Sequence, residues 1–223
     1  MAIKTIAIDG ACRRNGKPDC ISSGSCFIVV ESNGTEQSFV VSDHETESTS
    51  QRGELTGLLL AVENVSSSPM DTVIITDSEY LFNTITKRWV DRWQHNGWVT
   101  ADGSTVKNQD LWEKIWEIYL TVEEYTTMCH IKGHLLSVGV KKYHDLMYSD
   151  VTGFTLYQWV KNNKQVKPEK LEHALALFES NNGFRPNLDL LQKFAAMNVT
   201  VDAVANLCIE AYESAQWRAM LKV

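Results

Sequence analysis

The sequence predicts an α/β fold, in which a mixed five-stranded sheet is flanked by helices and followed by a small all-helical extension. Two observations lead to this prediction. Over residues 1–150, short β-branched and apolar runs alternate with segments of helical periodicity, whereas residues 151–223 contain helical patterns and no convincing strand. We therefore expect an α/β domain at 1–150 and a helical extension at 151–223.

The predicted strands and helices of the α/β domain follow from periodicity and turn signals. The ESNG turn at 31–34 joins two apolar runs as a hairpin. Leucines and valines then recur at helical spacing after Thr49, and the β-branched run at 71–76 is typical of a buried parallel strand. The expected strands are 3–8, 24–30, 36–41, 71–76 and 125–131, and the expected helices are about 50–66, 78–88, 109–122 and 141–148.

The extension contains three helical patterns, at 168–180, 186–197 and 201–221, with Thr200 as the N-cap of the last. Their apolar stripes are typical of a small helical core packed on the sheet domain. The alternative is a docking module for a replication protein or an extra nucleic-acid contact, because four lysines (Lys161, Lys164, Lys167 and Lys170) gather at the entrance to the extension.

Composition limits the classes of protein to consider. The net charge of −7 argues against a protein that coats nucleic acid through a broad positive surface. We find neither a secretory signal nor a run of eighteen apolar residues, and the five cysteines lack the spacing of a disulfide framework or a zinc site. We expect a cytoplasmic monomer that does not engage a membrane.

Five segments place acidic or imidazole groups at the ends of the predicted strands and helices. They are IAIDGAC at 6–12, TSQRGEL at 49–55, IITDSEY at 74–80, HIKGH at 130–134 and KKYHDL at 141–146. Taken singly, Asp9 could cap a turn, Glu54 could favour a helix N-terminus and Asp77 could cap a helix. Buried carboxylates are costly unless they are paired or bound to a metal, so together they predict a divalent-cation site of oxygen ligands.

These segments, in this order, resemble type 1 ribonuclease H, the endonucleases that cut the RNA strand of RNA–DNA hybrids. The resemblance spans roughly residues 3–150 and includes the tract GWVTADGSTVKNQDLW at 97–112. It implies a ribonuclease H-like fold and two-metal hydrolysis that leaves 5′-phosphate and 3′-hydroxyl ends. Two Mg²⁺ ions per site, with Mn²⁺ as a substitute, would be bound by Asp9, Glu54, Asp77 and Asp145, while His134 would assist proton transfer or product release.

The fourth carboxylate follows an unusual loop. The family pattern carries Gly and Asn after KGH, whereas HLLSVGVKKYHD at 134–145 is apolar and lacks that Asn. An insertion of one residue reconciles the spacing for Asp145, which also has a helical frame around it. Asp150 is the rival candidate.

The resemblance also assigns contacts with the hybrid. Asn15 and Gln51 would approach the RNA, and Thr49, Ser50 and Asn108 would form a pocket for a DNA phosphate. Trp93, in the Trp-rich stretch that resembles the family's basic protrusion, would touch the DNA strand. Asn15 could instead be only a turn former, and Thr49 only a helix cap.

Two other functions compete with the nuclease. A hybrid-binding module with weak or lost catalysis is favoured by the altered loop before Asp145 and by the acidic surface. A related exonuclease or resolvase on the same fold is disfavoured, because the TADGSTVKN tract at 100–108 and KGH at 132–134 resemble the hybrid-cutting family.

Overall fold

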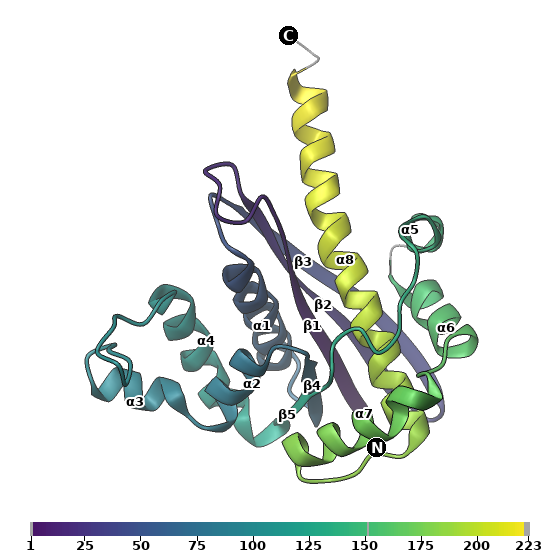
Figure 1. The fold of residues 1–223 in the computed structure, drawn as a ribbon, viewed down its shortest axis with the longest axis horizontal. Helices are drawn as coiled ribbons and strands as arrows, with labels where there is room; N and C mark the ends of the chain where they lie inside the picture. Colours follow the sequence, from purple (N-terminus) through teal and green to yellow (C-terminus); the bar gives the residue numbers. More distant parts are fainter. Residues whose placement is uncertain (1, 151, 221–223) are drawn as a thin grey trace.

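Five strands form one mixed sheet in the computed structural model, which describes residues 2–150 and 152–220 (Figure 1). The strand order is β3-β2-β1-β4-β5; β1 pairs antiparallel with β2 and parallel with β4. The β2–β3 pair is antiparallel and the β4–β5 pair is parallel, which confirms the predicted mixed sheet. The strands are β1 (Ile3–Arg13), β2 (Ile21–Ser32), β3 (Thr35–Thr46), β4 (Thr72–Thr76) and β5 (Thr126–His130).

The helices differ from the prediction in three places. The helices α3 and α6 were not expected, and the extension ends in one long helix, α8, where two were expected. Thr200 does not cap a new helix, because its hydroxyl donates to the carbonyl of Ala196 within α8. The helices are α1 (Ser50–Ser67), α2 (Glu79–Thr86), α3 (Trp89–His95), α4 (Gln109–Val122), α5 (Val140–Ser149), α6 (Phe154–Asn163), α7 (Pro168–Asn182) and α8 (Leu188–Met220), with a 3₁₀ turn, η1 (Glu123–Tyr125), before β5.

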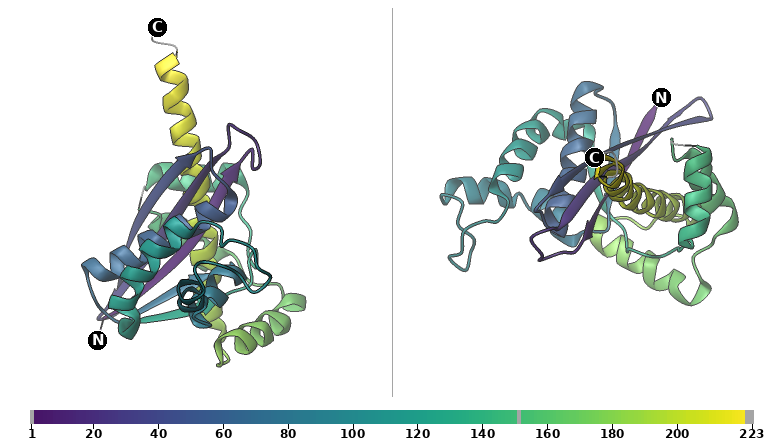
Figure 2. Two further views of the ribbon diagram at one scale, coloured as in Figure 1. Left: turned by 90° about the vertical axis from the view of Figure 1, so that its left-hand side faces the viewer. Right: turned by 90° about the horizontal axis from the view of Figure 1, so that it is seen from above.

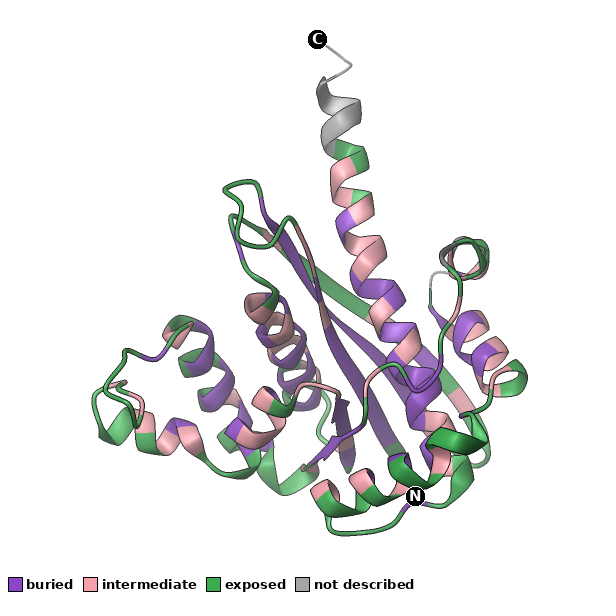
Figure 3. Cartoon of the chain, viewed as in Figure 1, coloured by how far each residue is buried: buried purple, intermediate pink, exposed green. Residues whose placement is uncertain are grey.

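The sheet separates two hydrophobic cores (Figures 2 and 3). Alternate residues of a strand point to opposite faces, so Ile6 and Ile8 pack with α1 and α4 while Ala7 packs on the α8 side. Trp112 of α4 and Phe194 of α8 are among the large side chains that fill the two cores. The α1 and α8 helices therefore cover opposite faces of the sheet.

A division at residue 150 does not separate two cores. Strand residues such as Ala7 and Phe27 belong to the same buried cluster as Leu156, Phe194 and Val201 from beyond residue 150. The extension thus supplies the helix that covers the second face of the sheet. Helices α5, α6 and α7 lie in the chain between β5 and that helix.

The α7 helix is joined to β5 by side-chain hydrogen bonds. The Asn182 side chain accepts from the His130 backbone N–H and donates to the His130 carbonyl, at 2.8 and 2.9 Å. The Asn181 amide lies 2.7 Å from His130 Nδ1, while Nε2 lies 3.2 Å from the Asp77 carbonyl oxygen. If Asn181 donates to Nδ1, then Nε2 carries the proton and donates to the Asp77 backbone.

Among the described residues, the segment Leu188–Ala215 of α8 is long and apolar enough to cross a membrane. In its most apolar window, 61% of the residues are buried inside the structure. These apolar side chains therefore also serve as the core of the α8 face.

Candidate active site

The parallel pairing of β1 and β4 sets the first two carboxylates side by side. Ala7 is paired with Ile75 at the end of the ladder. Asp9 and Asp77 each come two residues after this pair along the chain, so the two lie side by side where the parallel ladder ends. Asp77 directly follows the last residue of β4.

The third carboxylate depends on a close approach of α1 to the sheet. A Cβ added to Gly10 would lie 2.3 Å from the Glu54 nitrogen, and one on Gly24 would lie 2.2 Å from the Gly57 nitrogen. Only glycine fits at these two strand positions, because the obstructing atoms belong to the helix backbone. Glu54, in the second turn of α1, is thereby placed beside Asp9.

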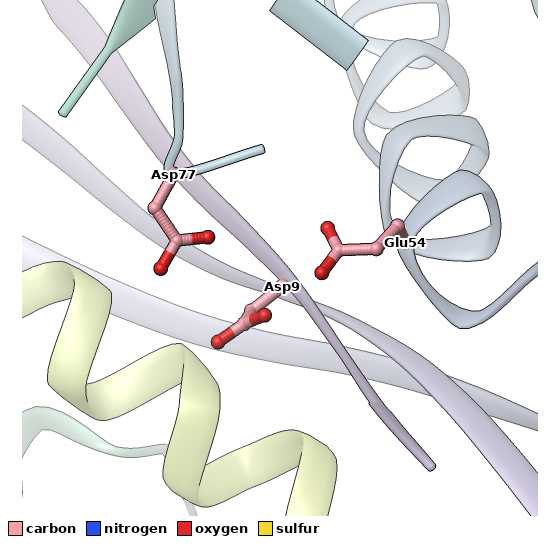
Figure 4. Close-up of side chains that lie close together, drawn as sticks. All are labelled: Asp9, Glu54 and Asp77. Carbon is pink, nitrogen blue, oxygen red and sulfur yellow. The ribbon is translucent and has the colours of Figure 1, made fainter. Parts of the chain in front are cut away.

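The three carboxylates point toward one another (Figure 4). One oxygen each from Asp9, Glu54 and Asp77 lies within 4.8 Å of the others. Asp9 is buried, and its Oδ1 accepts from the Gly10 N–H at 2.7 Å. Glu54 Oε2 is buried without a hydrogen-bond partner among the described residues. Because a buried unpartnered carboxylate oxygen is unfavourable, this geometry fits a cation ligand.

Burial and the neighbouring negative charges favour protonation of Asp9 and Glu54. Burial raises the pKa of Asp9 well above its ordinary value, and the charges of Glu54, Asp77 and Asp202 raise it further, against the Gly10 hydrogen bond. Burial, with the charge of Asp77, raises the pKa of Glu54 to about 8. A divalent cation would reverse this preference by stabilising the ionised forms.

The raised pKa of Glu54 predicts a pH-dependent stability for the metal-free protein. Its folded-state pKa of about 8 lies above its ordinary value of 4.5, so the folded protein holds a proton that the unfolded chain releases. The stability that this bound proton contributes to the folded state is fully present below about pH 4.5 and is lost as the pH rises through about 8. In EDTA at pH 8, Glu54→Gln should therefore melt above wild type, by about 2–4 °C for each kcal/mol gained.

Thermal melts of both proteins at pH 5 and pH 8 measure this effect. Glu63→Gln, on an exposed position of the same helix, is the matched control and should melt like wild type. Addition of Mg²⁺ should stabilise wild type more at pH 8 than at pH 5. Equal wild-type and Glu54→Gln melting temperatures at pH 8 would show that Glu54 does not carry this penalty.

A fourth carboxylate, Asp202 of α8, lies near enough to act electrostatically on Asp9, although it is not among the three whose oxygens lie within 4.8 Å of one another. Burial raises the pKa of Asp202; His134 lowers it and Asp77 raises it, so both groups lie close enough to act on it. One turn earlier on α8, the Asn198 side-chain amide donates to Asp77 Oδ2 at 3.3 Å. The Asn198 Oδ1 atom is buried and has no hydrogen-bond partner among the described residues.

The structure does not bring Asp145 to this cluster. Asp145 is exposed on α5, which packs against α6, and its charge is not among those that act on Asp9. The rival Asp150 caps the start of α6 through hydrogen bonds with Thr152 and Thr155. Asp145 and Asp150 thus lie on or beside the helices α5 and α6, which come between the KGH loop and α8 in the chain.

Sequence reasoning missed Asp202 and Asn198. A weak signal for them existed, since Asp202 is a lone charge in the apolar stretch VTVDAVA at 199–205. A charged side chain in such a buried stretch marks a position that needs a partner.

His134 lies at the rim of the site. It is exposed with a left-handed backbone, at a φ of 55°. Together with Asn198 and Asp202 it lines a cavity of about 180 Å³. His134 therefore lies beside Asp202, and its part in proton transfer or product release stays a prediction.

The predicted substrate contacts gather around the start of α1. Asn15 lies 3.4 Å from both the Ser50 hydroxyl and the Ser50 backbone nitrogen, and Asn108 donates to Gln51 Oε1 at 3.1 Å. Thr49 caps α1 by accepting from the Arg52 N–H. The structure thus brings the five residues together, with Thr49 also in the capping role considered from the sequence.

Trp93 belongs to an aromatic cluster. Its ring centroid lies 6.2 Å from that of Trp89, 6.5 Å from that of Trp98 and 5.9 Å from that of Trp112. Trp93 is only partly buried, so one part of the ring packs on the core while another faces solvent. Part of the Trp93 ring is therefore accessible at the surface.

Comparisons with known proteins point to one family. The ribonuclease H family model matches residues 2–143. The ribonuclease H of Maricaulis maris (strain MCS10) is 34% identical over 146 residues, which cover 66% of this chain and 91% of the relative. That of Prosthecochloris aestuarii (strain DSM 271 / SK 413) is 31% identical over 159 residues, covering 71% of this chain and 96% of the relative.

Two solved structures share the fold at lower identity. A crystal structure of LC9-RNase H1, described as a type 1 RNase H with the type 2 active-site motif, aligns with a TM-score of 0.51 and 16% identity, covering 88% of this chain and 84% of that one. The solution structure of the PFV RNase H domain aligns with a TM-score of 0.51 and 19% identity, covering 70% and 94%. At this identity the likeness concerns the fold alone.

Proposed function

This chain belongs to the ribonuclease H family and is a ribonuclease H enzyme, and from that premise we propose that it hydrolyses the RNA strand of RNA–DNA hybrids endonucleolytically. The observation that carries the proposal is the convergence of the Asp9, Glu54 and Asp77 oxygens within 4.8 Å of one another. All the donors are carboxylate oxygens, which favour Mg²⁺ or Mn²⁺ over zinc.

We assign two Mg²⁺ ions to the site, with Mn²⁺ as a substitute. Asp9, Glu54 and Asp77 would hold them, and Asp202 would complete the set of four carboxylates. The buried, unpartnered Glu54 Oε2 supports this fit. When bound, such cations would polarise the scissile phosphate and help to ionise a water. Attack of that water on phosphorus with departure of the 3′ oxygen would give 5′-phosphate and 3′-hydroxyl ends.

The chain's own residues would prepare the site in two ways. Asn198 steadies one Asp77 oxygen through its side-chain amide, and the His130 ring lies within hydrogen-bonding distance of the Asp77 carbonyl. His134, on the rim beside Asp202, would exchange a proton with the leaving or attacking group, which suits an imidazole near neutral pH. The two roles are distinct, since one positions a ligand and the other moves a proton.

The substrate would lie across the start of α1. Asn15 and Gln51 are suited to approach the RNA strand, while Thr49, Ser50 and Asn108 are suited to a DNA phosphate. Trp93 offers a partly exposed ring for the DNA strand. The alternative of a catalytically weak binding module is less favoured, because Asp202 offers a candidate for the fourth carboxylate.

A substrate panel tests the proposed function. With Mg²⁺, the protein should cut the RNA strand of a hybrid at internal positions and leave single-stranded RNA and duplex DNA intact. Asp77→Asn should reduce cleavage by at least about a hundredfold, because it removes a ligand whose cation supplies several kcal/mol of transition-state stabilisation. Equal cleavage of single-stranded RNA, or full activity of Asp77→Asn, would reject the proposal.

A further inference from the structure

A basic segment, residues 140–170, lies along the chain between the loop that carries His134 and α8. Residues 140–170 contain six lysines and three acidic residues, although the whole chain has a net charge of −7. One of the acidic residues, Asp150, is occupied by hydrogen bonds at the start of α6. Positive charge is therefore concentrated on α5, α6 and the start of α7.

Two of these lysines share one aromatic ring. The Lys142 ammonium of α5 lies 4.9 Å from the centre of the Trp159 ring, and that of Lys164, at the end of α6, lies 5.6 Å from it. Trp159 is partly buried against the core, and Gln192 of α8 donates to the Lys164 carbonyl. The ring thus orders two flexible cations on a fixed support, which lowers the entropy lost when an anion binds them.

Lys142 and Lys164 have no acidic partner within the part of the chain that the structure describes. Among the residues that the structure describes, neither Lys142 nor Lys164 forms an ion pair, and Asp145, one turn along α5, pairs with neither. Lys161 is different, because Glu36 neutralises it. The arginines Arg13, Arg14, Arg52, Arg88 and Arg185 are likewise paired with carboxylates.

The two ammonium groups over the Trp159 ring form a site suited to an anion. Like charges on one ring repel each other, and a phosphate relieves that repulsion. We propose that Lys142, Trp159 and Lys164 form a second nucleic-acid contact that binds the phosphate backbone of a hybrid outside the catalytic groove. This inference rests on the proposed function, because the hybrid is the polyanion that the enzyme handles.

The position of the contact suits a long duplex. The loop that carries His134 leads directly into α5, and Tyr143 of α5 lines the same cavity as His134 and Asp202. Figure 1 shows α5 and α6 on the far side of α8 from α1, while the Trp-rich α3 lies at the other end of the molecule. A hybrid of several turns could therefore engage both ends, whereas a short one would engage the site alone.

The test measures hybrid binding in an Asp77→Asn background, which prevents cleavage. Lys142→Gln combined with Lys164→Gln removes the two charges, and Lys167→Gln combined with Lys170→Gln is the matched control on the start of α7. Hybrids of about 10 and about 30 base pairs, roughly one and three helical turns, are titrated at several salt concentrations. Thermal melts establish that both double variants fold.

We expect the Lys142/Lys164 variant to weaken binding of the long hybrid about tenfold and to lower its salt slope by about two. In the Lys142/Lys164 variant the ratio of long-hybrid to short-hybrid affinity should also fall, whereas the control variant should retain the wild-type ratio. An unchanged ratio and slope, or an equal loss in the control variant, would overturn the second contact even if hybrids are still cut. Absence of any hybrid binding or cleavage by wild type would instead overturn the proposed function and this inference together.

Discussion

Replacing Asp202 by Asn should reduce hybrid cleavage by at least about a hundredfold, whereas Asp145→Asn should leave it within about twofold of wild type. Asp202 acts electrostatically on Asp9 and lies with His134 at the same cavity, while Asp145 is exposed on α5. The amide keeps the size of the side chain and the possibility of a hydrogen bond with Asn206. A loss of cleavage in Asp202→Asn would therefore result from the missing negative charge.

Single-turnover cleavage of a labelled hybrid at saturating Mg²⁺ measures this difference. Raising the Mg²⁺ concentration should recover part of the Asp202→Asn activity if the carboxylate binds a cation. Thermal melts of the variant provide the folding control. Full activity in Asp202→Asn together with loss in Asp145→Asn would return the fourth carboxylate to α5.

Gly24→Ala should destabilise the protein by about 2–4 kcal/mol, which corresponds to a fall in melting temperature of roughly 5–15 °C. The added methyl group would lie 2.2 Å from the Gly57 nitrogen and 2.4 Å from the Gly53 carbonyl oxygen. Both are backbone atoms of α1, so the helix itself must move away from the sheet. That movement should also carry Glu54 away from Asp9 and lower the affinity for Mg²⁺.

Gly139→Ala is the matched control, because a Cβ at Gly139 meets no atom within 4 Å and its φ is not positive. Its free energy of unfolding should stay within about 0.5 kcal/mol of wild type. Chemical denaturation compares the three proteins. A Gly24→Ala protein as stable as Gly139→Ala would mean that α1 does not depend on this close approach.

The sequence predicted those parts of the site that local structure determines. Asp9 comes directly after the apolar run 3–8 inside β1, Asp77 directly follows β4, and Glu54 lies near the start of α1, so pattern and motif pointed to all three. The mixed sheet was predictable from apolar runs bounded by turns, but β1, β2 and β3 have 11, 12 and 12 residues and extend beyond the runs 3–8, 24–30 and 36–41. The close approach of α1 was not foreseen, because the contact of Gly10 and Gly24 with Gly53 and Gly57 is tertiary.

Asp202 was missed because no local rule links it to the KGH loop. The chain inserts α5, α6 and α7 before the helix that covers the sheet, and spacing from His134 therefore led to Asp145. The continuity of α8 was also missed, since Thr200 resembled an N-cap but bonds back to Ala196 inside the helix. In both cases packing against β1 and β2 decides the outcome, and local propensity does not.

The most direct test of the central claim follows the fate of a hybrid whose RNA strand carries a 5′ label. With Mg²⁺, wild-type protein should cut that strand internally and leave 3′-hydroxyl ends on the labelled fragments, while the DNA strand stays intact. EDTA should abolish cleavage, and excess Mg²⁺ should restore it. If wild-type protein binds the hybrid but never cuts it with Mg²⁺ or Mn²⁺, the carboxylate cluster is not a hydrolytic site and the proposed function is wrong.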